Sequence, residues 1–111
     1  MVDKFFLATG EILLENGRKI DLTAREAVVL GSLWKRSQTM PNNPYATAQM
    51  MAGWIWGPAD QWPEHWYVII HQILSHIRHK ARRRTWQMHH KDEYGYRFEG
   101  DLEVVEGDEH G

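Results

Sequence analysis

Hydrophobic residues recur at helical spacing through one segment in the second half of the chain. The members of this apolar stripe are Trp66, Ile69, Ile70, Ile73, Leu74, Ile77 and Ala81. Because residues three or four apart share one side of a helix, the stripe predicts an amphipathic helix over about residues 64–84 with one buried edge. The outward side contains no acid and comprises His71, Gln72, Ser75, Arg78, His79 and Arg82. A helix of this kind is expected to lie against another molecule, and nucleic acid is the first candidate.

Residues 4–22 have the alternation of short strands. The expected strands are 5–7, 11–14 and 18–20, and Asn16-Gly17 between the last two is typical of a two-residue hairpin turn. These strands predict a small antiparallel sheet at the N-terminus.

Two capping signals predict two further helices. Thr23 and Glu26 have the spacing of a capping box, in which each side chain accepts a hydrogen bond from a free amide of the first turn. Thr47 is expected to cap a second helix, which continues to Trp56 and ends at Gly57-Pro58. The expected buried face of the first helix consists of Ala27, Val29, Leu30, Leu33 and Trp34.

After the long helix, residues 85–90 and 94–99 read as two strands joined by a turn at 91–93. The predicted fold class is therefore α+β, with a small N-terminal antiparallel sheet, a three-helix core and a C-terminal β-hairpin. This order predicts a winged helix-turn-helix, in which the third helix docks on DNA and the hairpin forms the wing.

Charge is distributed unevenly along the chain. The net charge is −2, but residues 101–111 contain five acids and no Lys or Arg. Residues 1–100 therefore contain thirteen bases and ten acids. We expect residues 1–100 to form one domain and residues 101–111 to form a flexible acidic tail. Six bases and no acid occur between residues 78 and 91, namely Arg78, Lys80, Arg82, Arg83, Arg84 and Lys91. Such a stripe is typical of a site for a polyanion, although a solvated helix end would also place cations favourably.

Other patterns narrow the class of protein. Cys is absent, which excludes disulfides and thiolate metal sites. The apolar runs are too short to span a bilayer and the start lacks a signal-peptide pattern, so we expect a soluble, cytoplasmic protein with no membrane partner. No phosphate loop or nucleophile motif is present, and we expect no enzyme activity. His76, His79 and one of His89 and His90 could form a three-His site, but nothing completes a familiar spacing. No metal or cofactor is therefore expected.

Four segments resemble OmpR/PhoB-type response-regulator effector domains. Leu22–Leu30 is similar to their first helix, and Ile55-Trp56-Gly57 resembles the Val-Trp-Gly that ends their second helix. Ile77-Arg78-His79-Lys80 resembles the Leu-Arg-Lys-Lys near the end of their recognition helix, and Gly95-Tyr96-Arg97-Phe98 resembles the Gly-Tyr-Arg-Leu/Phe that closes their wing. The resemblance covers about residues 5–99 and implies a four-stranded N-terminal sheet, a recognition helix in the major groove and a wing at the minor groove. It also implies homodimers on tandem sites and contact with RNA polymerase through residues 58–63.

The chain departs from this family in three ways. It has no receiver domain, so control by phosphorylation is not expected. The recognition helix of the family begins with Arg, whereas this segment begins with Tyr67 and Val68. The wing turn usually has Gly where Glu93 stands, and Asp92 adds a second acid there. A standalone, divergent domain suggests a small regulator carried by a phage or mobile element.

The predicted contacts fall into three groups. The expected base contacts are His71, Gln72, Ser75 and His79, since Gln can pair with adenine through two hydrogen bonds. The expected phosphate contacts are Arg78, Arg82, Arg83, Arg84, Lys91 and Arg97. Lys80 is expected near the buried seam with its ammonium reaching outward. Trp62, in a loop beside Pro63, is the candidate protein contact, while the other tryptophans are expected in the core.

These observations predict a sequence-specific double-stranded DNA-binding transcriptional regulator that is not controlled by phosphorylation. The alternative is a winged-helix adaptor that binds RNA polymerase or another regulator protein. The basic run at residues 78–84 favours DNA, whereas the apolar start of the helix at residues 66–68 and the acidic tail favour the adaptor.

Overall fold

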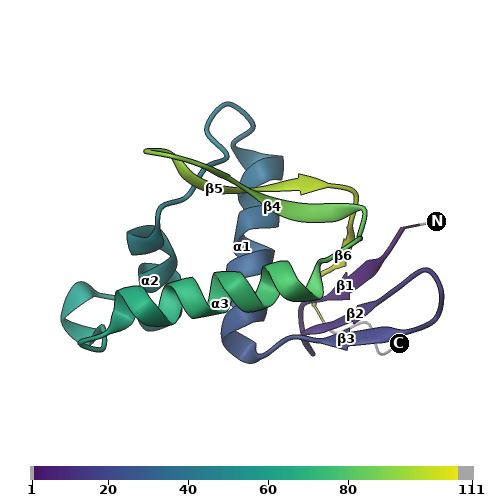
Figure 1. Cartoon of the computed structure of the whole chain (residues 1–111), viewed down its shortest axis with the longest axis horizontal. Helices are drawn as coiled ribbons and strands as arrows, with labels where there is room; N and C mark the ends of the chain where they lie inside the picture. Colours follow the sequence, from purple (N-terminus) through teal and green to yellow (C-terminus); the bar gives the residue numbers. More distant parts are fainter. Residues whose placement is uncertain (1, 108–111) are drawn as a thin grey trace.

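Three helices and two small sheets make up residues 2–107, the part of the chain that the computed structural model describes (Figure 1). The strands are β1 (Lys4–Phe6), β2 (Glu11–Leu13), β3 (Lys19–Asp21), β4 (Trp86–Lys91), β5 (Gly95–Gly100) and β6 (Glu103–Val105). The helices are α1 (Ala24–Thr39), α2 (Ala48–Trp56), the short 3-10 helix η1 (Ala59–Gln61) and α3 (Trp66–Lys80). The prediction of an α+β fold with an N-terminal set of strands, three helices and a C-terminal hairpin is confirmed. Within these residues, no helix has the length and apolar character needed to cross a membrane.

The four-stranded sheet has the order β3-β2-β1-β6. β1, β2 and β3 pair antiparallel, as predicted, whereas β6 joins β1 in parallel. Phe5 at the centre of β1 lies opposite Ile12 on one side and Val104 on the other, and all three side chains belong to or pack against the core. The fourth strand therefore comes from the end of the chain, and not from its beginning as the family resemblance implied.

The expectation of a flexible tail over residues 101–111 is wrong for its first part. Leu102 is buried at 8% exposure, and Val104 packs against the core. The amide of Leu7 donates to Val105 O at 3.1 Å and that of Glu103 donates to Asp3 O at 3.0 Å. These apolar and backbone contacts hold the segment on the sheet despite its acidic composition. Residues 108–111 lie outside the described part of the chain.

The predicted caps are present, and one predicted turn differs. Glu26 N donates to Thr23 Oγ1 and Thr23 N donates to Glu26 Oε1, so the capping box at the start of α1 is confirmed. Met50 N donates to Thr47 Oγ1 at the start of α2. The hairpin between β2 and β3 uses a three-residue turn and not the predicted two-residue turn, because Leu14 N bonds to Arg18 O. Gly17 adopts a left-handed φ of +90°, whereas Asn16 does not.

Helix α3 is shorter than predicted, since it ends at Lys80 and not near residue 84. Ile70, Leu74 and Ile77 lie in the core, which confirms the buried stripe, and Trp66 and Ile69 are half-buried at its edge. The arginine run leaves the helix as a turn, in which Arg83 has a left-handed φ of +61°. The three consecutive arginines therefore lie on a turn beyond α3 and not on one continuous helical face.

The hairpin β4–β5 packs against α1 beside α3. Figure 1 shows α3 running along the length of the molecule, with α2 beside its first half and the N-terminal strands beyond its last turn. Trp86 in β4 is fully buried and donates from Nε1 to Asp3 Oδ2 at 2.9 Å. Tyr96 and Ala46 exchange two backbone hydrogen bonds, and a side chain at Gly95 (φ +102°) would collide with the Ala46 carbonyl. These contacts fix the hairpin relative to the helices.

Candidate nucleic-acid interface

The outer face of α3 presents all four residues predicted to contact bases, since His71, Gln72, Ser75 and His79 are exposed. Burial of Ile70, Leu74 and Ile77 on the opposite side orients them outward. No acidic residue lies within α3. This face can therefore donate hydrogen bonds to a polyanion without an adjacent carboxylate on the same helix.

Two arginines directly beyond α3 are exposed cations among the predicted phosphate contacts. Arg82 and Arg83 are both exposed, and neither forms an ion pair within residues 2–107. They follow the last turn of α3 directly, so their charge lies at the end of the outer face. A cation in this arrangement can approach a phosphate without first losing a partner.

Two further cations lie over aromatic rings of the hairpin. The guanidinium carbon of Arg78 is 5.2 Å from the centroid of Tyr96, and the ammonium of Lys91 is 4.8 Å from that of Tyr94. Both residues are exposed. The rings hold these charges near the hairpin and leave them free to contact an anion.

The remaining two predicted phosphate contacts are engaged within the protein. Arg84 is half-buried, and its Nη1 lies 3.9 Å from Asp3 Oδ2. Arg97 donates from Nη2 to Glu99 Oε2 at 3.2 Å and lies over the ring of Tyr45. These contacts favour structural roles for both arginines, and neither points as freely into solvent as Arg82.

Lys80 does not reach outward as predicted. Its ammonium donates to Glu26 Oε1 at 2.6 Å and to Asp21 O at 2.9 Å. Glu26 is only 2% exposed, and its second oxygen lies 3.6 Å from His76 Nδ1. Burial opposes ionisation of this carboxyl, but hydrogen bonds from Lys80 and Thr23, with the charges of Lys80 and His76, outweigh it and lower the pKa of Glu26. The buried carboxylate draws the lysine inward and ties α3 to α1.

A cleft of about 470 Å³ separates the first half of α3 from the start of α2 and the hairpin. His90 stacks on Tyr96 with centroids 4.5 Å apart, and Tyr67 lies 4.3 Å from His71. The other lining residues are Thr47, Ala48, Gln49, Trp66, Glu93 and Gly95. At the hairpin turn, Glu93 adopts a left-handed φ of +75° beside the highly exposed Asp92. The cleft thus has aromatic and imidazole walls, with acids only at the hairpin tip.

Trp62 is not the prominent exposed ring that its loop position suggested. Its Nε1 donates to Gly57 O at 2.8 Å, and its ring packs edge-on against Trp66 at 4.9 Å. The exposed apolar surface at this end of α3 belongs instead to Tyr67 and Val68, which are 56% and 54% exposed. The sequence showed that both residues begin the helix, but their exposure depends on how α3 packs.

The histidines considered for a three-His metal site are not grouped in the structure of residues 2–107. Within residues 2–107, no three His, Asp or Glu side chains form a group suited to a metal ion. His76 faces Glu26, and His90 stacks on Tyr96.

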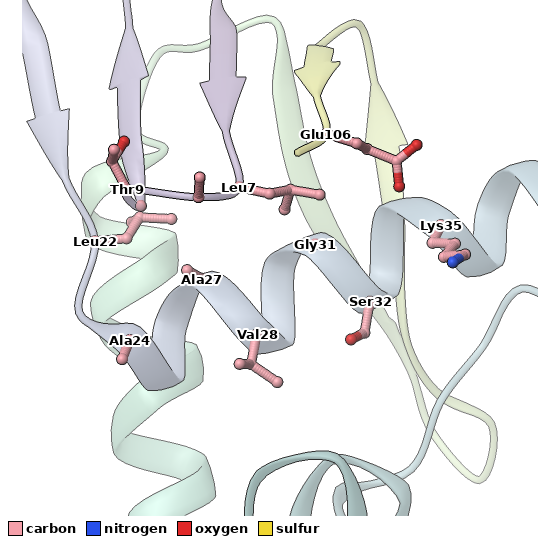
Figure 2. Close-up of a pocket in the computed structure, with 12 residues that line it drawn as sticks. Leu7, Thr9, Leu22, Ala24, Ala27, Val28, Gly31, Ser32, Lys35 and Glu106 are labelled. Atoms are coloured by element: carbon pink, nitrogen blue, oxygen red, sulfur yellow. The ribbon is translucent and has the colours of Figure 1, made fainter. Parts of the chain in front are cut away.

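A separate hollow of about 510 Å³ lies between α1 and the turn that joins β1 to β2. Figure 2 shows Lys35 and Glu106 near one end of this hollow and Thr9 and Ala24 near the other. Its remaining walls are largely aliphatic. It contains no pairing of a nucleophile with a base that would suggest chemistry.

Neither a family model, nor a curated protein, nor a solved structure matches the chain. The candidate site is therefore defined by the geometry of α3, the turn at residues 82–84 and the hairpin β4–β5.

Proposed function

We propose that this protein is a sequence-specific double-stranded DNA-binding transcriptional regulator with a winged helix-turn-helix fold. In this proposal α3 enters the major groove and the hairpin β4–β5 is the wing at the minor groove. The observation that carries it is the exposed, acid-free face of α3, which continues directly into Arg82 and Arg83. An α-helix with its side chains is about 10–12 Å wide and matches a major groove of about 12 Å.

The proposed contacts divide by chemistry. Gln72 offers a paired donor and acceptor for adenine, and Ser75 and the imidazoles of His71 and His79 can bond to base edges. The phosphate contacts are assigned first to the cations free of carboxylates, which are Arg78, Arg82, Arg83 and Lys91. Arg84 and Arg97 would bind phosphate only by leaving Asp3 and Glu99, so they contribute less.

Kinship to OmpR/PhoB-type effector domains remains part of the proposal. The left-handed φ of Glu93 supports it, because the family usually has Gly at this turn and Gly adopts positive φ without strain. Membership of this family would also imply that the protein forms homodimers on tandem sites and contacts RNA polymerase near residues 58–63. The fourth strand of the sheet, β6, pairs in parallel with β1.

Salt dependence of binding to random duplex DNA tests the proposal. Four phosphate contacts imply a loss of affinity of roughly two decades between about 50 and 200 mM salt. Arg82→Ala and Arg83→Ala should weaken binding, whereas Arg18→Ala, on the exposed hairpin between β2 and β3, should not. Absence of binding at low salt would overturn the proposal.

The exposed pair Tyr67 and Val68 favours a second function, that of an adaptor that binds RNA polymerase or another regulator protein. Two acids, Asp60 and Glu64, precede this pair and are also exposed. If the adaptor is correct, Tyr67→Ala weakens binding to purified RNA polymerase and the protein has no measurable affinity for duplex DNA. The acid-free character of α3 makes DNA the better-supported partner.

A further inference from the structure

Val68 lies on the outer face of α3, near the start of this helix. Val68, Gln72, Ser75 and His79 follow one another at spacings of four, three and four residues, which places them in one line on a helix. Val68 is 54% exposed, while the other three members of the line are polar. A branched hydrocarbon thus begins a line of side chains that are otherwise suited to hydrogen bonding.

Contacts within the protein do not account for this placement. The neighbouring ring of Tyr67 packs on Trp66 and His71 and leaves Val68 uncovered. The Ile70 side chain, two positions later, is completely buried, so the helix has its core contact without Val68. A single exposed valine is common on protein surfaces. Val68, however, lies in the proposed line of DNA contacts, so an apolar group on the DNA is expected opposite it.

The major groove presents one apolar group on a base edge, the C5 methyl of thymine. We infer that Val68 contacts a thymine methyl and makes the protein select a T·A pair near the pair read by Gln72. This inference rests on the proposed function. Four residues of helix rise by about 6 Å, which corresponds to roughly two base pairs at about 3.4 Å each. The selected thymine is therefore expected about two base pairs from the adenine that pairs with Gln72.

The charges along the whole of α3 favour DNA over a protein as the occupant of its outer face. His71 and Gln72, which follow Val68 in the next turn, are donors, and no carboxylate lies on α3. Arg82 and Arg83 carry positive charge beyond the other end of the line, which begins at Val68 and ends at His79. Glu64 is the nearest preceding acid in the chain and lies before the helix begins. A groove lined with phosphates complements this arrangement.

Uracil provides a direct test, because it lacks only the methyl group of thymine. A duplex is first selected from a random pool, and each thymine is then replaced singly by uracil. Loss of one buried methyl should weaken wild-type binding about fourfold at one position. Val68→Ala should bind the thymine and uracil duplexes equally and keep the wild-type salt slope, since no charge is removed.

Val28→Ala is the matched control, because Val28 is also an exposed valine, at 39%, but lies on α1. This variant should keep the fourfold discrimination. If the selected duplex binds with steep salt dependence but no single replacement of thymine by uracil changes the affinity, the role of Val68 is overturned and the proposed function stands. Discrimination that survives in Val68→Ala does the same. Failure to bind any duplex overturns both this inference and the proposed function.

Discussion

The ammonium of Lys80 donates a 2.6 Å hydrogen bond to the buried carboxylate of Glu26, joining the last turn of α3 to the first turn of α1. Glu26 also closes the capping box with Thr23, so one carboxylate both begins α1 and anchors α3. The orientation of the proposed recognition helix therefore depends on a group outside its own outer face.

Replacement of Lys80 should destabilise the fold by leaving a buried carboxylate without its main partner. For Lys80→Ala we expect a loss of about 2–3 kcal/mol in the free energy of unfolding, below the range for fully buried pairs because Lys80 is itself partly exposed. Urea denaturation measures this change. Lys19→Ala removes the exposed partner of Glu11 and should cost less than about 1 kcal/mol. Equal losses in the two variants would show that the pair of Lys80 and Glu26 stabilises the fold no more than an exposed ion pair does.

Acid should remove the contribution of Glu26 to stability. Because its pKa is lowered in the folded protein from the ordinary value of 4.5, this contribution is complete above about that pH and declines as the pH falls through the folded value. In Glu26→Gln this dependence is absent. The difference in unfolding free energy between wild type and Glu26→Gln should therefore shrink between pH 6 and pH 3, as followed by denaturation at each pH. A difference that stays constant would contradict the lowered pKa.

Arg82→Ala and Arg83→Ala should weaken DNA binding by a similar factor on every sequence. Each variant removes about one phosphate contact, so the slope of log affinity against log salt should become shallower by about one unit. Titrations at several salt concentrations, with Arg18→Ala as the control, measure the slope. An unchanged slope would place these arginines away from the DNA backbone.

Gln72→Ala should relax preference at a single base pair. Loss of a bidentate contact to adenine corresponds to about 1–3 kcal/mol of discrimination at that pair and leaves the others unaffected. Affinities for single-base variants of the selected duplex test this expectation. Gln38→Ala, an exposed substitution near the end of α1, is the control. A uniform loss on all sequences would instead assign Gln72 to the backbone.

Removal of β6 should destabilise the domain despite the acidic character of this segment. A chain that ends at residue 101 loses the buried Leu102 and the pairing of β6 with β1, which together correspond to about 2–4 kcal/mol. A chain that ends at residue 107 keeps both and serves as the control. Thermal unfolding of the two chains gives the comparison, and equal midpoints would show that β6 contributes nothing.

Much of the local structure could be predicted because its causes lie within a few residues. The capping box of Thr23 and Glu26 and the cap at Thr47 depend on groups three residues apart. The buried stripe of α3 follows from helical periodicity alone. The same periodicity predicted that Gln72 and Ser75 lie on the outer face.

Contacts between distant segments required the tertiary structure. Lys80 and Glu26 are 54 positions apart, and Trp86 and Asp3 are 83 positions apart, so no local pattern relates them. Only packing distinguished the freely exposed Arg82 from Arg84, which approaches Asp3, although both belong to one basic run. The sequence by itself determined the periodicities and the caps, because these are local preferences of the backbone. The tertiary structure decided which charges remain free and where β6 pairs, because burial and long-range partners depend on all the elements together.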